Sequence, residues 1–262
     1  MINRDDEFFG ELEATCRADQ VLSYSTHDHN ADVYCASVDF RPNGFDAEIV
    51  TPWGGGQINS SLLGDFNVSN VLAAVAVLGL LGSDINDICR WAREIEGASG
   101  RMDLIKPERG PAIVIDYAHT PDALEKALLA LARHKNGRLY CIVGCGGDRD
   151  TGKRPLMGSL AARLADQAIL TSDNPRGEEP LDIIKAMMAD IEGAANVRAI
   201  VDRAEAIRTA LEEAGEGDVV LIAGKGHEEY QDIAGRHLPF SDYDEVRKYL
   251  GHERGGRNGS EA

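Results

Sequence analysis

The chain has 262 residues, 43% hydrophobic and 27% charged, which suffices for one large domain or two small ones with a buried core. Its net charge of −17 argues against nucleic acid or an anionic membrane as the main partner. Five cysteines without Cys-x-x-Cys spacing, no signal-peptide pattern and a longest apolar run of only 71–81 predict a cytoplasmic protein with free thiols.

The sequence pattern of residues 1–100 predicts a set of strands and helices that does not form an obvious complete fold. In chain order, the pattern predicts a helix over 7–16, strands over 20–24, 32–39, 45–51 and 57–63, and helices over 71–81 and 84–96. The second and third of these strands flank Pro42-Asn43-Gly44, which favours a hairpin.

From about residue 101 apolar strands alternate with amphipathic helices. The predicted strands are 112–116, 138–144, 167–171, 197–201 and 218–222, and the predicted helices are 121–133, 155–165, 180–191, 204–214 and 243–250, with a hairpin at 230–240. Alternation at this spacing predicts an α/β domain with a mostly parallel, doubly wound, Rossmann-like sheet. The polar, glycine-rich segment 251–262 is predicted to be disordered.

The loop after the third predicted strand of this half carries a compact charged motif. Asp173, Asn174 and Arg176 follow that strand directly, where open α/β sheets place their ligands. A guanidinium forks onto a carboxylate and an aspartate accepts from an ammonium, so the motif suits a zwitterion. The alternative is a turn in which Asp173 and Arg176 pair with each other and cap the next helix.

The first strand of this half ends at Asp116, and His119 follows it. Thr120 has the position of a helix N-cap, with Pro121 as the first helical residue. A carboxylate at a strand end can bind ribose hydroxyls, and the histidine can contact a phosphate or carboxylate. A capped helix with solvated neighbours explains the same residues.

The second strand leads into a loop that imitates a phosphate-binding loop. Residues 147–153 fit Gly-x-x-x-x-Gly-Lys, but Arg154 replaces the Ser or Thr whose hydroxyl holds Mg²⁺. Pro155 also stands where the following helix needs free N–H groups. We interpret the loop as a look-alike, in which Arg149 and the glycine backbone could hold an anionic group of another ligand; a basic, mobile loop is the alternative.

The fifth strand ends in Gly224-Lys-Gly-His-Glu228. The glycines allow the backbone to approach a ligand closely, and Glu228 could accept from an ammonium. We expect five charged side chains to converge on one sheet edge: Asp116, Arg149, Asp173, Arg176 and Glu228. No His, Cys, Asp or Glu grouping in this sequence has metal-ligand spacing, so no metal ligand is predicted in the chain.

Six ordered motifs together resemble the Mur ligases, and among them the members that add meso-diaminopimelate. They are Gly64-Asp-Phe-Asn-Val-Ser-Asn70, Gly100-Arg-Met-Asp103, Asp116-Tyr-Ala-His-Thr-Pro121, Gly144-Cys-Gly-Gly-Asp-Arg149, Asp173-Asn-Pro-Arg176 and Gly224-Lys-Gly-His-Glu228. The resemblance implies an ATP-dependent acid–amino-acid ligase of peptidoglycan precursor synthesis. The terminal carboxylate of UDP-MurNAc-L-Ala-D-Glu becomes an acyl phosphate, and the amine of diaminopimelate displaces the phosphate.

The resemblance also implies roles for individual residues. It places ATP near Asn67, Asn70, Arg101 and Asp116, with His119 and the hinge residue Arg101 at the reaction centre. It assigns the diaminopimelate pocket to Arg149, Asp173, Asn174, Arg176, Gly224 and Glu228. Lysine-adding relatives lack the arginine that matches Arg176, because lysine has no distal carboxylate.

The sequence departs from the family in lacking the UDP-sugar domain, the Gly-rich phosphate loop ending in Lys-Thr, and the Mg²⁺-binding glutamate and modified lysine that follow it. We therefore expect 1–100 to be the C-terminal part of the central ATPase domain, 101–250 to be the complete amino-acid-binding domain, and the isolated chain to be inactive unless a separate chain supplies the missing half. Two other functions stay open: a non-catalytic diaminopimelate- or peptide-binding module, and another amino-acid or dipeptide ligase of the same superfamily. A nucleotide hydrolase built on 147–153 is a more distant alternative.

Overall fold

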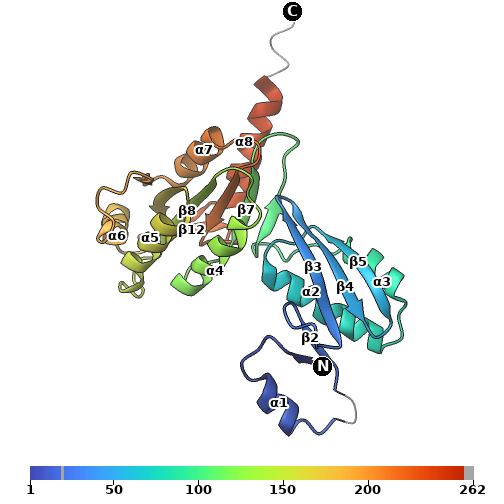
Figure 1. Cartoon of the computed structure of the whole chain (residues 1–262). Coiled ribbons are helices and arrows are strands. Elements are labelled where there is room, and N and C mark those ends of the chain that lie inside the picture. The colour runs from blue at the N-terminus through green and yellow to red at the C-terminus, as the bar shows by residue number, and fades with distance from the viewer. Residues whose placement is uncertain (19–20, 257–262) are drawn as a thin grey trace, which may run out of the picture. The chain divides into compact units, whose positions relative to one another are not determined.

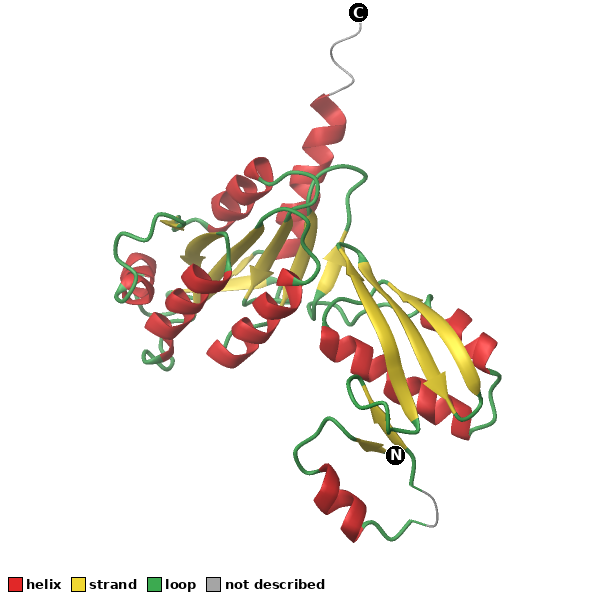
Figure 2. Ribbon diagram, viewed as in Figure 1, coloured by secondary structure: helices red, strands yellow, loops and turns green. Residues whose placement is uncertain are grey.

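The computed structural model describes residues 1–18 and 21–256, with side chains up to residue 251 (Figures 1 and 2). The chain divides into two compact units, Met1–Glu96 and Gly97–Ala262. This division falls four residues before the boundary expected from the sequence. None of the helices in the described part of the chain has the length and apolar character needed to cross a membrane.

The first unit is built on a five-stranded sheet with the order β1-β2-β3-β4-β5. Its strands are β1 (Ile2–Asn3), β2 (Ser23–Ser25), β3 (Val33–Arg41), β4 (Gly44–Thr51) and β5 (Gly54–Ser60), and its helices are α1 (Phe9–Thr15), α2 (Asp65–Leu80) and α3 (Ile85–Ala92). Strands β1 to β3 pair in parallel, and β3 to β5 pair antiparallel. The predicted hairpin is confirmed, and its turn is formed by Pro42 and Asn43. Gly44 follows as the first residue of β4, and its φ of 137° and closeness to the Ser60 carbonyl exclude a side chain.

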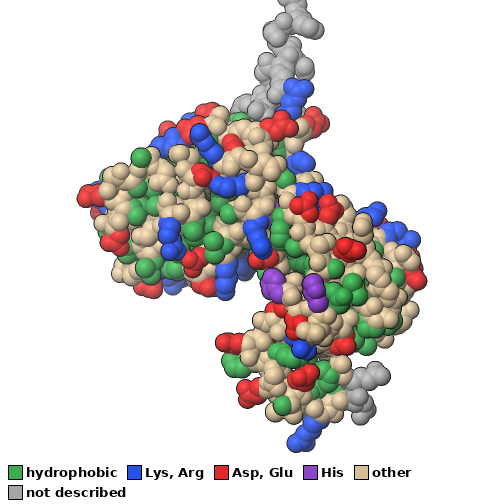
Figure 3. Space-filling model, viewed as in Figure 1, with side chains coloured by type: hydrophobic (Ala, Val, Ile, Leu, Met, Phe, Trp, Pro, Cys, Tyr) green, Lys and Arg blue, Asp and Glu red, His purple; other side chains and the backbone are tan. Residues whose placement is uncertain are grey.

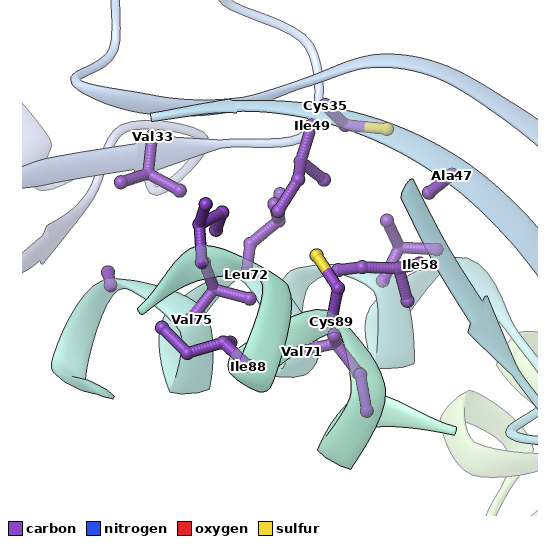
Figure 4. Close-up of a cluster of buried hydrophobic side chains, with 14 of the residues drawn as sticks. Val33, Cys35, Ala47, Ile49, Ile58, Val71, Leu72, Val75, Ile88 and Cys89 are labelled. Carbon is purple, nitrogen blue, oxygen red and sulfur yellow. The ribbon is translucent and has the colours of Figure 1, made fainter. Parts of the chain in front are cut away.

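The core of the first unit lies between this sheet and helices α2 and α3. Figure 4 shows Val33 and Ile49 of the sheet pointing toward Leu72 and Val75 of α2 and Ile88 of α3. All five side chains are almost completely buried. Helix α2 begins six residues before the predicted start at 71, because its first turn is polar and therefore lies outside the apolar run on which the prediction rested.

The second unit is built on a six-stranded sheet with the order β10-β9-β8-β11-β7-β6. Its strands are β6 (Asp103–Ile105), β7 (Ala112–Asp116), β8 (Leu139–Cys145), β9 (Gln167–Ser172), β10 (Val197–Ala199) and β11 (Val219–Ala223). All pairings are parallel except that of β6 with β7. The predicted α/β class and mostly parallel sheet are confirmed, whereas β6 was not predicted.

Helices cover both faces of this second sheet. The chain steps in one direction from β7 through β8 and β9 to β10, crossing by α4 (Pro121–Ala132), α5 (Lys153–Leu164) and α6 (Pro180–Met188). It then returns to β11 by α7 (Arg203–Glu213). Right-handed crossovers place helices of opposite steps on opposite faces. Helices α7 and α8 (Asp242–Gly256) accordingly share a core with alternate strand residues such as Ile113, Ile142 and Val220.

Two further segments of the second unit bear on the predictions. The predicted hairpin consists of β12 (Tyr230–Ile233) and β13 (Arg236–Pro239), paired antiparallel. Helix α8 continues to Gly256, so 251–256, for which composition predicted disorder, are helical; a helix that has already formed extends more easily than composition alone suggests. The rest of the expected tail, 257–262, lies outside the described residues.

The face of the molecule shown in Figure 3 carries acidic and basic side chains interspersed over each unit. No broad basic surface is visible on that face, in keeping with a net charge of −17.

Candidate functional site

The candidate site lies at the edge of the second sheet where β7, β8, β9 and β11 have their carboxyl ends. Strand β11 lies between β8 and β7 in this sheet. The chain leaves β8 toward α5 on one face, whereas the segment after β11 leads to α8 on the other. Such a reversal opens a crevice beyond the strand ends, where open α/β sheets bind ligands.

Lys225, two residues after the end of β11, is at the centre of this edge although its side chain is 0% exposed. Its Nζ donates to Asn174 Oδ1 at 3.0 Å and to Glu228 Oε2 at 3.1 Å, and lies 3.6 Å from Asp173 Oδ1. Asn174 Nδ2 donates to the same Glu228 oxygen at 2.9 Å. The loops after β9 and β11 therefore share one buried polar cluster, defined here as Asp173, Asn174, Lys225 and Glu228.

Glycine at position 224 makes this close approach possible. Its φ is 116°, and a Cβ there would lie 2.6 Å from Asp173 Oδ2. An alanine would therefore strain the backbone and press against the carboxylate at the same time.

The charge of Asp173 depends on its neighbours. Burial raises the pKa of its carboxyl group, while the nearby Arg203 and Lys225 oppose that rise and Glu228 and Asp242 add to it. Desolvation disfavours a charged carboxylate unless positive groups compensate it. Asp173 is therefore an anionic site only as long as its cationic partners stay in place.

Arg176 is held by its backbone and offers its guanidinium at the rim. Its φ is 51°, its N–H donates to Asp232 O at 2.9 Å, and its carbonyl accepts from Ala234 N at 2.7 Å. These bonds fasten the loop after β9 to the β12–β13 hairpin. Nη1 donates to Gly147 O at 2.8 Å, and Nε lies 3.9 Å from Asp232 Oδ2.

The partners of Asp173 and Arg176 decide between the two interpretations of their motif. Among the described residues, Asp173 faces Lys225 while Arg176 contacts Gly147 and Asp232. The turn is therefore not held together by a pair between Asp173 and Arg176, as the structural alternative required.

The look-alike loop after β8 is fastened to the loop after β9. Gly147 N donates to Asn174 O at 2.9 Å, and any Cβ at Gly147 would overlap the Pro175 carbonyl. Buried Arg154 forks onto Glu178 at 2.7 and 2.9 Å and lowers the pKa of that carboxyl to about 2. The arginine that replaces the Mg²⁺-binding hydroxyl thus has a structural partner. Lys153 Nζ donates to His119 O at 2.8 Å, and Arg149 is exposed on the same loop.

Asp116, at the end of β7, binds the segment before β6. Its two oxygens accept from Met102 N at 2.7 Å and Ala118 N at 2.8 Å, and burial raises the pKa of its carboxyl. Next to these residues in the chain, the exposed Arg101 guanidinium lies over the Tyr117 ring, 5.0 Å from its centroid. His119 is also exposed, with Nδ1 2.8 Å from Tyr117 O.

The two asparagines predicted near ATP belong to the first unit. They lie in the first turns of α2, where Asn67 Nδ2 donates to Leu63 O at 2.7 Å and Asn70 Nδ2 donates to Asn67 Oδ1 at 3.0 Å. Within the described residues, no three His, Cys, Asp or Glu side chains are grouped to hold a metal ion.

Comparison with known families supports the motif-based prediction. Residues 1–78 match the Mur ligase middle domain, and residues 100–226 match the glutamate ligase domain of the Mur ligases. The chain belongs to the Mur ligase family. The predicted family is confirmed, and Mur ligases are ATP-dependent enzymes.

Relatives within the family are similar over nearly all of this chain. The UDP-N-acetylmuramoyl-L-alanyl-D-glutamate–2,6-diaminopimelate ligase of Pseudomonas aeruginosa is 46% identical over 250 residues, or 95% of this chain and 51% of that protein. The enzyme of the same name from Coxiella burnetii is 45% identical over 255 residues, or 95% of this chain and 52% of that protein. The chain thus spans about half the length of the curated relatives it matches.

Solved structures give the same picture. A structure of a ligase of that name superimposes with a TM-score of 0.81 and 40% identity, covering 96% of this chain and 53% of that one. MurF from Acinetobacter baumannii reaches a TM-score of 0.62 at 18% identity over 95% of this chain and 51% of that one, which shows a shared fold.

The structure of this Mur ligase chain sorts the predicted site residues into groups. Asp173, Asn174 and Glu228 join the buried polar cluster, with Gly224 against it and Arg176 at the rim. Arg101, Asp116 and His119 gather around the end of β7, whereas Asn67 and Asn70 lie in the first unit and Arg149 is exposed on its loop.

Sequence reasoning missed Lys225, although a lysine between two glycines directly after a buried strand could have signalled it. It also missed Asp232, which has no such signal in the sequence.

Proposed function

We propose that this Mur ligase chain binds meso-diaminopimelate for ATP-dependent addition to UDP-MurNAc-L-Ala-D-Glu in peptidoglycan precursor synthesis. The similarity to ligases of that name supports the proposal. One observation carries it: the buried polar cluster has an excess of negative charge, and it lies beside Arg176. The loop of Arg176 is hydrogen-bonded both to the β12–β13 hairpin and to the loop after β8.

The charges of the cluster suit an ammonium. Asp173 and Glu228 contribute two negative charges and Lys225 one positive charge, so the group keeps one uncompensated negative charge in a largely buried place. A ligand ammonium bound at the cluster would compensate this remaining negative charge, because buried charges need a partner of opposite sign. Binding would therefore favour an amino acid over a plain carboxylic acid.

The guanidinium of Arg176 suits a carboxylate. It carries five N–H donors, and Nη1 is directed at the Gly147 and Asn174 carbonyls. The remaining donors can form the planar fork that recognises a carboxylate. Diaminopimelate has a carboxylate at its distal end and lysine has none, so Arg176 would select diaminopimelate over lysine.

ATP is proposed to bind to Asn67, Asn70, Arg101 and Asp116. His119 and Arg101 are proposed to act at the reaction centre, and Arg149 to reach the amino acid from its exposed loop. Each Asp116 oxygen accepts one backbone N–H and keeps a lone pair for a ribose hydroxyl. ATP with Mg²⁺ would convert the dipeptide carboxylate to an acyl phosphate for attack by the amine.

The proposal is tested by calorimetric titration of the chain with meso-diaminopimelate and with lysine. Arg176→Ala is expected to weaken diaminopimelate binding roughly 10- to 100-fold, the scale of a lost charge-assisted hydrogen bond, and to leave lysine binding unchanged. Arg163→Ala, on the exposed face of α5, is the matched control and should change neither. Equal affinity of the wild-type chain for both ligands would contradict the proposal.

Inactivity of the isolated chain and dependence on a separate chain stay predictions, as does a cytoplasmic location. Phosphate release from the pure protein with ATP, diaminopimelate and the UDP-linked dipeptide tests the first two. Turnover without any added protein would contradict them.

A further inference from the structure

A fully buried ion pair lies beneath the candidate site. Arg203 is the first residue of α7 and Asp242 the first of α8, and both side chains are 0% exposed. Arg203 Nε and Nη2 fork onto the Asp242 carboxylate at 2.7 and 2.8 Å. Because burying two charges costs about as much free energy as their attraction returns, such a pair contributes little to stability compared with apolar side chains of the same volume. Its position in the fold indicates another role.

The pair is joined to the loop that carries Lys225 and Glu228. Arg203 Nη2 also donates to Ala223 O at 3.0 Å, and Ala223 is the last residue of β11. Nη1 is buried and, within the described residues, has no hydrogen-bond partner. The guanidinium is thus held against the carboxyl end of β11, even though its Nη1 donors are left unsatisfied.

The charge of Arg203 also acts on Asp173. Together with Lys225 it opposes the rise in the pKa of that carboxyl that burial causes, while Glu228 and Asp242 act in the opposite direction. The neighbouring thiol on β8, Cys145, stays neutral because burial raises its pKa to about 11.

We infer that Arg203, held in place by Asp242, is a positioning residue of the amino-acid site: it fixes the base of the loop after Ala223 and keeps Asp173 negatively charged for the ammonium of the ligand. The inference rests on the proposed function. The side chain of Arg203 is 0% exposed, so its effect on a ligand passes through Asp173 and the Ala223 carbonyl.

Three variants separate this role from a structural one. Arg203→Met with Asp242→Asn removes both charges and nearly conserves volume, so no unpaired charge remains buried. Asp242→Asn alone keeps the guanidinium and an acceptor oxygen for it. Arg203→Lys keeps the positive charge without the planar fork.

The first measurement needs no ligand. The titration of the Asp173 carboxyl is followed by carbon-detected NMR, with its resonance identified from Asp173→Asn. We expect the titration midpoint to rise in the double variant, to fall in Asp242→Asn because a negative neighbour is lost, and to stay near wild type in Arg203→Lys. An unchanged midpoint in the double variant would overturn the inference.

The second measurement is calorimetric binding of meso-diaminopimelate between pH 5 and 8. An ammonium needs the ionised carboxylate, so affinity is present above the pKa of Asp173 and is lost as the pH falls through it. The double variant should lose affinity at a higher pH than wild type, and below both midpoints it should bind about tenfold more weakly, the scale of one pKa unit. Equal losses in the double variant and in Asp242→Asn, without displacement along the pH axis, would indicate a structural role only. Absence of binding by the wild-type chain would refute the proposed function, and the NMR titration would still decide whether Arg203 controls the charge of Asp173.

Discussion

Replacing Lys225 by methionine tests the buried polar cluster most severely. The substitution keeps most of the side-chain volume but removes the cation between Asp173 and Glu228, which are 9% and 22% exposed. Two charged hydrogen bonds, at 3.0 and 3.1 Å, and the contact of 3.6 Å to Asp173 are lost. Breaking a buried pair by removing one partner costs about 3–5 kcal/mol. We expect a loss of that size in the unfolding free energy of the second unit at neutral pH.

The loss should depend on pH in a defined direction. Without Lys225 the folded-state pKa of Asp173 moves further above its unfolded value. Such a group favours the folded state below its unfolded pKa, and that advantage disappears as the pH rises through the folded pKa. The difference between variant and wild type should therefore be largest near pH 7 and shrink toward pH 4.

Urea unfolding followed by two probes measures this effect for each unit. Both tryptophans, Trp53 and Trp91, lie in the first unit, so their fluorescence should give the same transition in variant and wild type. Far-UV circular dichroism reports both units and should show the second transition displaced. Lys126→Met is the matched control, because its pair with Asp122 is exposed and worth at most about 0.5 kcal/mol. Equal stability of the two variants, or a difference independent of pH, would refute the reasoning.

Two further predictions concern the loop after β8. Gly147→Ala should destabilise the second unit by about 1–3 kcal/mol, because its Cβ would overlap the Pro175 carbonyl, whereas Gly215→Ala, with ordinary space around it, should have little effect on the same thermal transition. Glu178→Gln should remove one contribution to the pH dependence of the unfolding free energy. Because Arg154 lowers the pKa of Glu178 to about 2, this carboxylate stabilises the fold above pH 4.5, and that stabilisation is lost as the pH falls toward 2. Urea midpoints across that range should show a shallower acid loss for the glutamine variant, and parallel curves would contradict this assignment.

The sequence was most informative where a segment is buried on both sides. Strand β7 was predicted with its observed bounds, and β8, β9 and β11 to within one residue at each end, because each is an apolar run between polar loops. Thr120 was predicted as an N-cap, and its hydroxyl accepts from Ala123 N. Strand β6 escaped prediction because three half-buried residues at a sheet edge give no periodic signal.

The site was predictable in its location more than in its contacts. The strand ends placed Asp173, Asn174 and Glu228 on one edge, and they do share a cluster. The cation at its centre, Lys225, was missed despite its place between two glycines, because lysine is usually exposed and only the fold shows it buried. Arg203 lies 30 residues after Asp173 in the chain and on another element, so its influence on that carboxylate exists only in three dimensions.

The central claim is that the cluster of Asp173, Asn174, Lys225 and Glu228 receives an ammonium while Arg176 receives a carboxylate of the same ligand. Calorimetry of the wild-type chain with three compounds tests it directly: meso-diaminopimelate, lysine without the distal carboxylate, and pimelate without either ammonium. We expect diaminopimelate to bind at least about tenfold more tightly than each of the other two, since each loses a charged contact. Pimelate binding as tightly as diaminopimelate would show that the cluster does not hold an ammonium and would contradict the account.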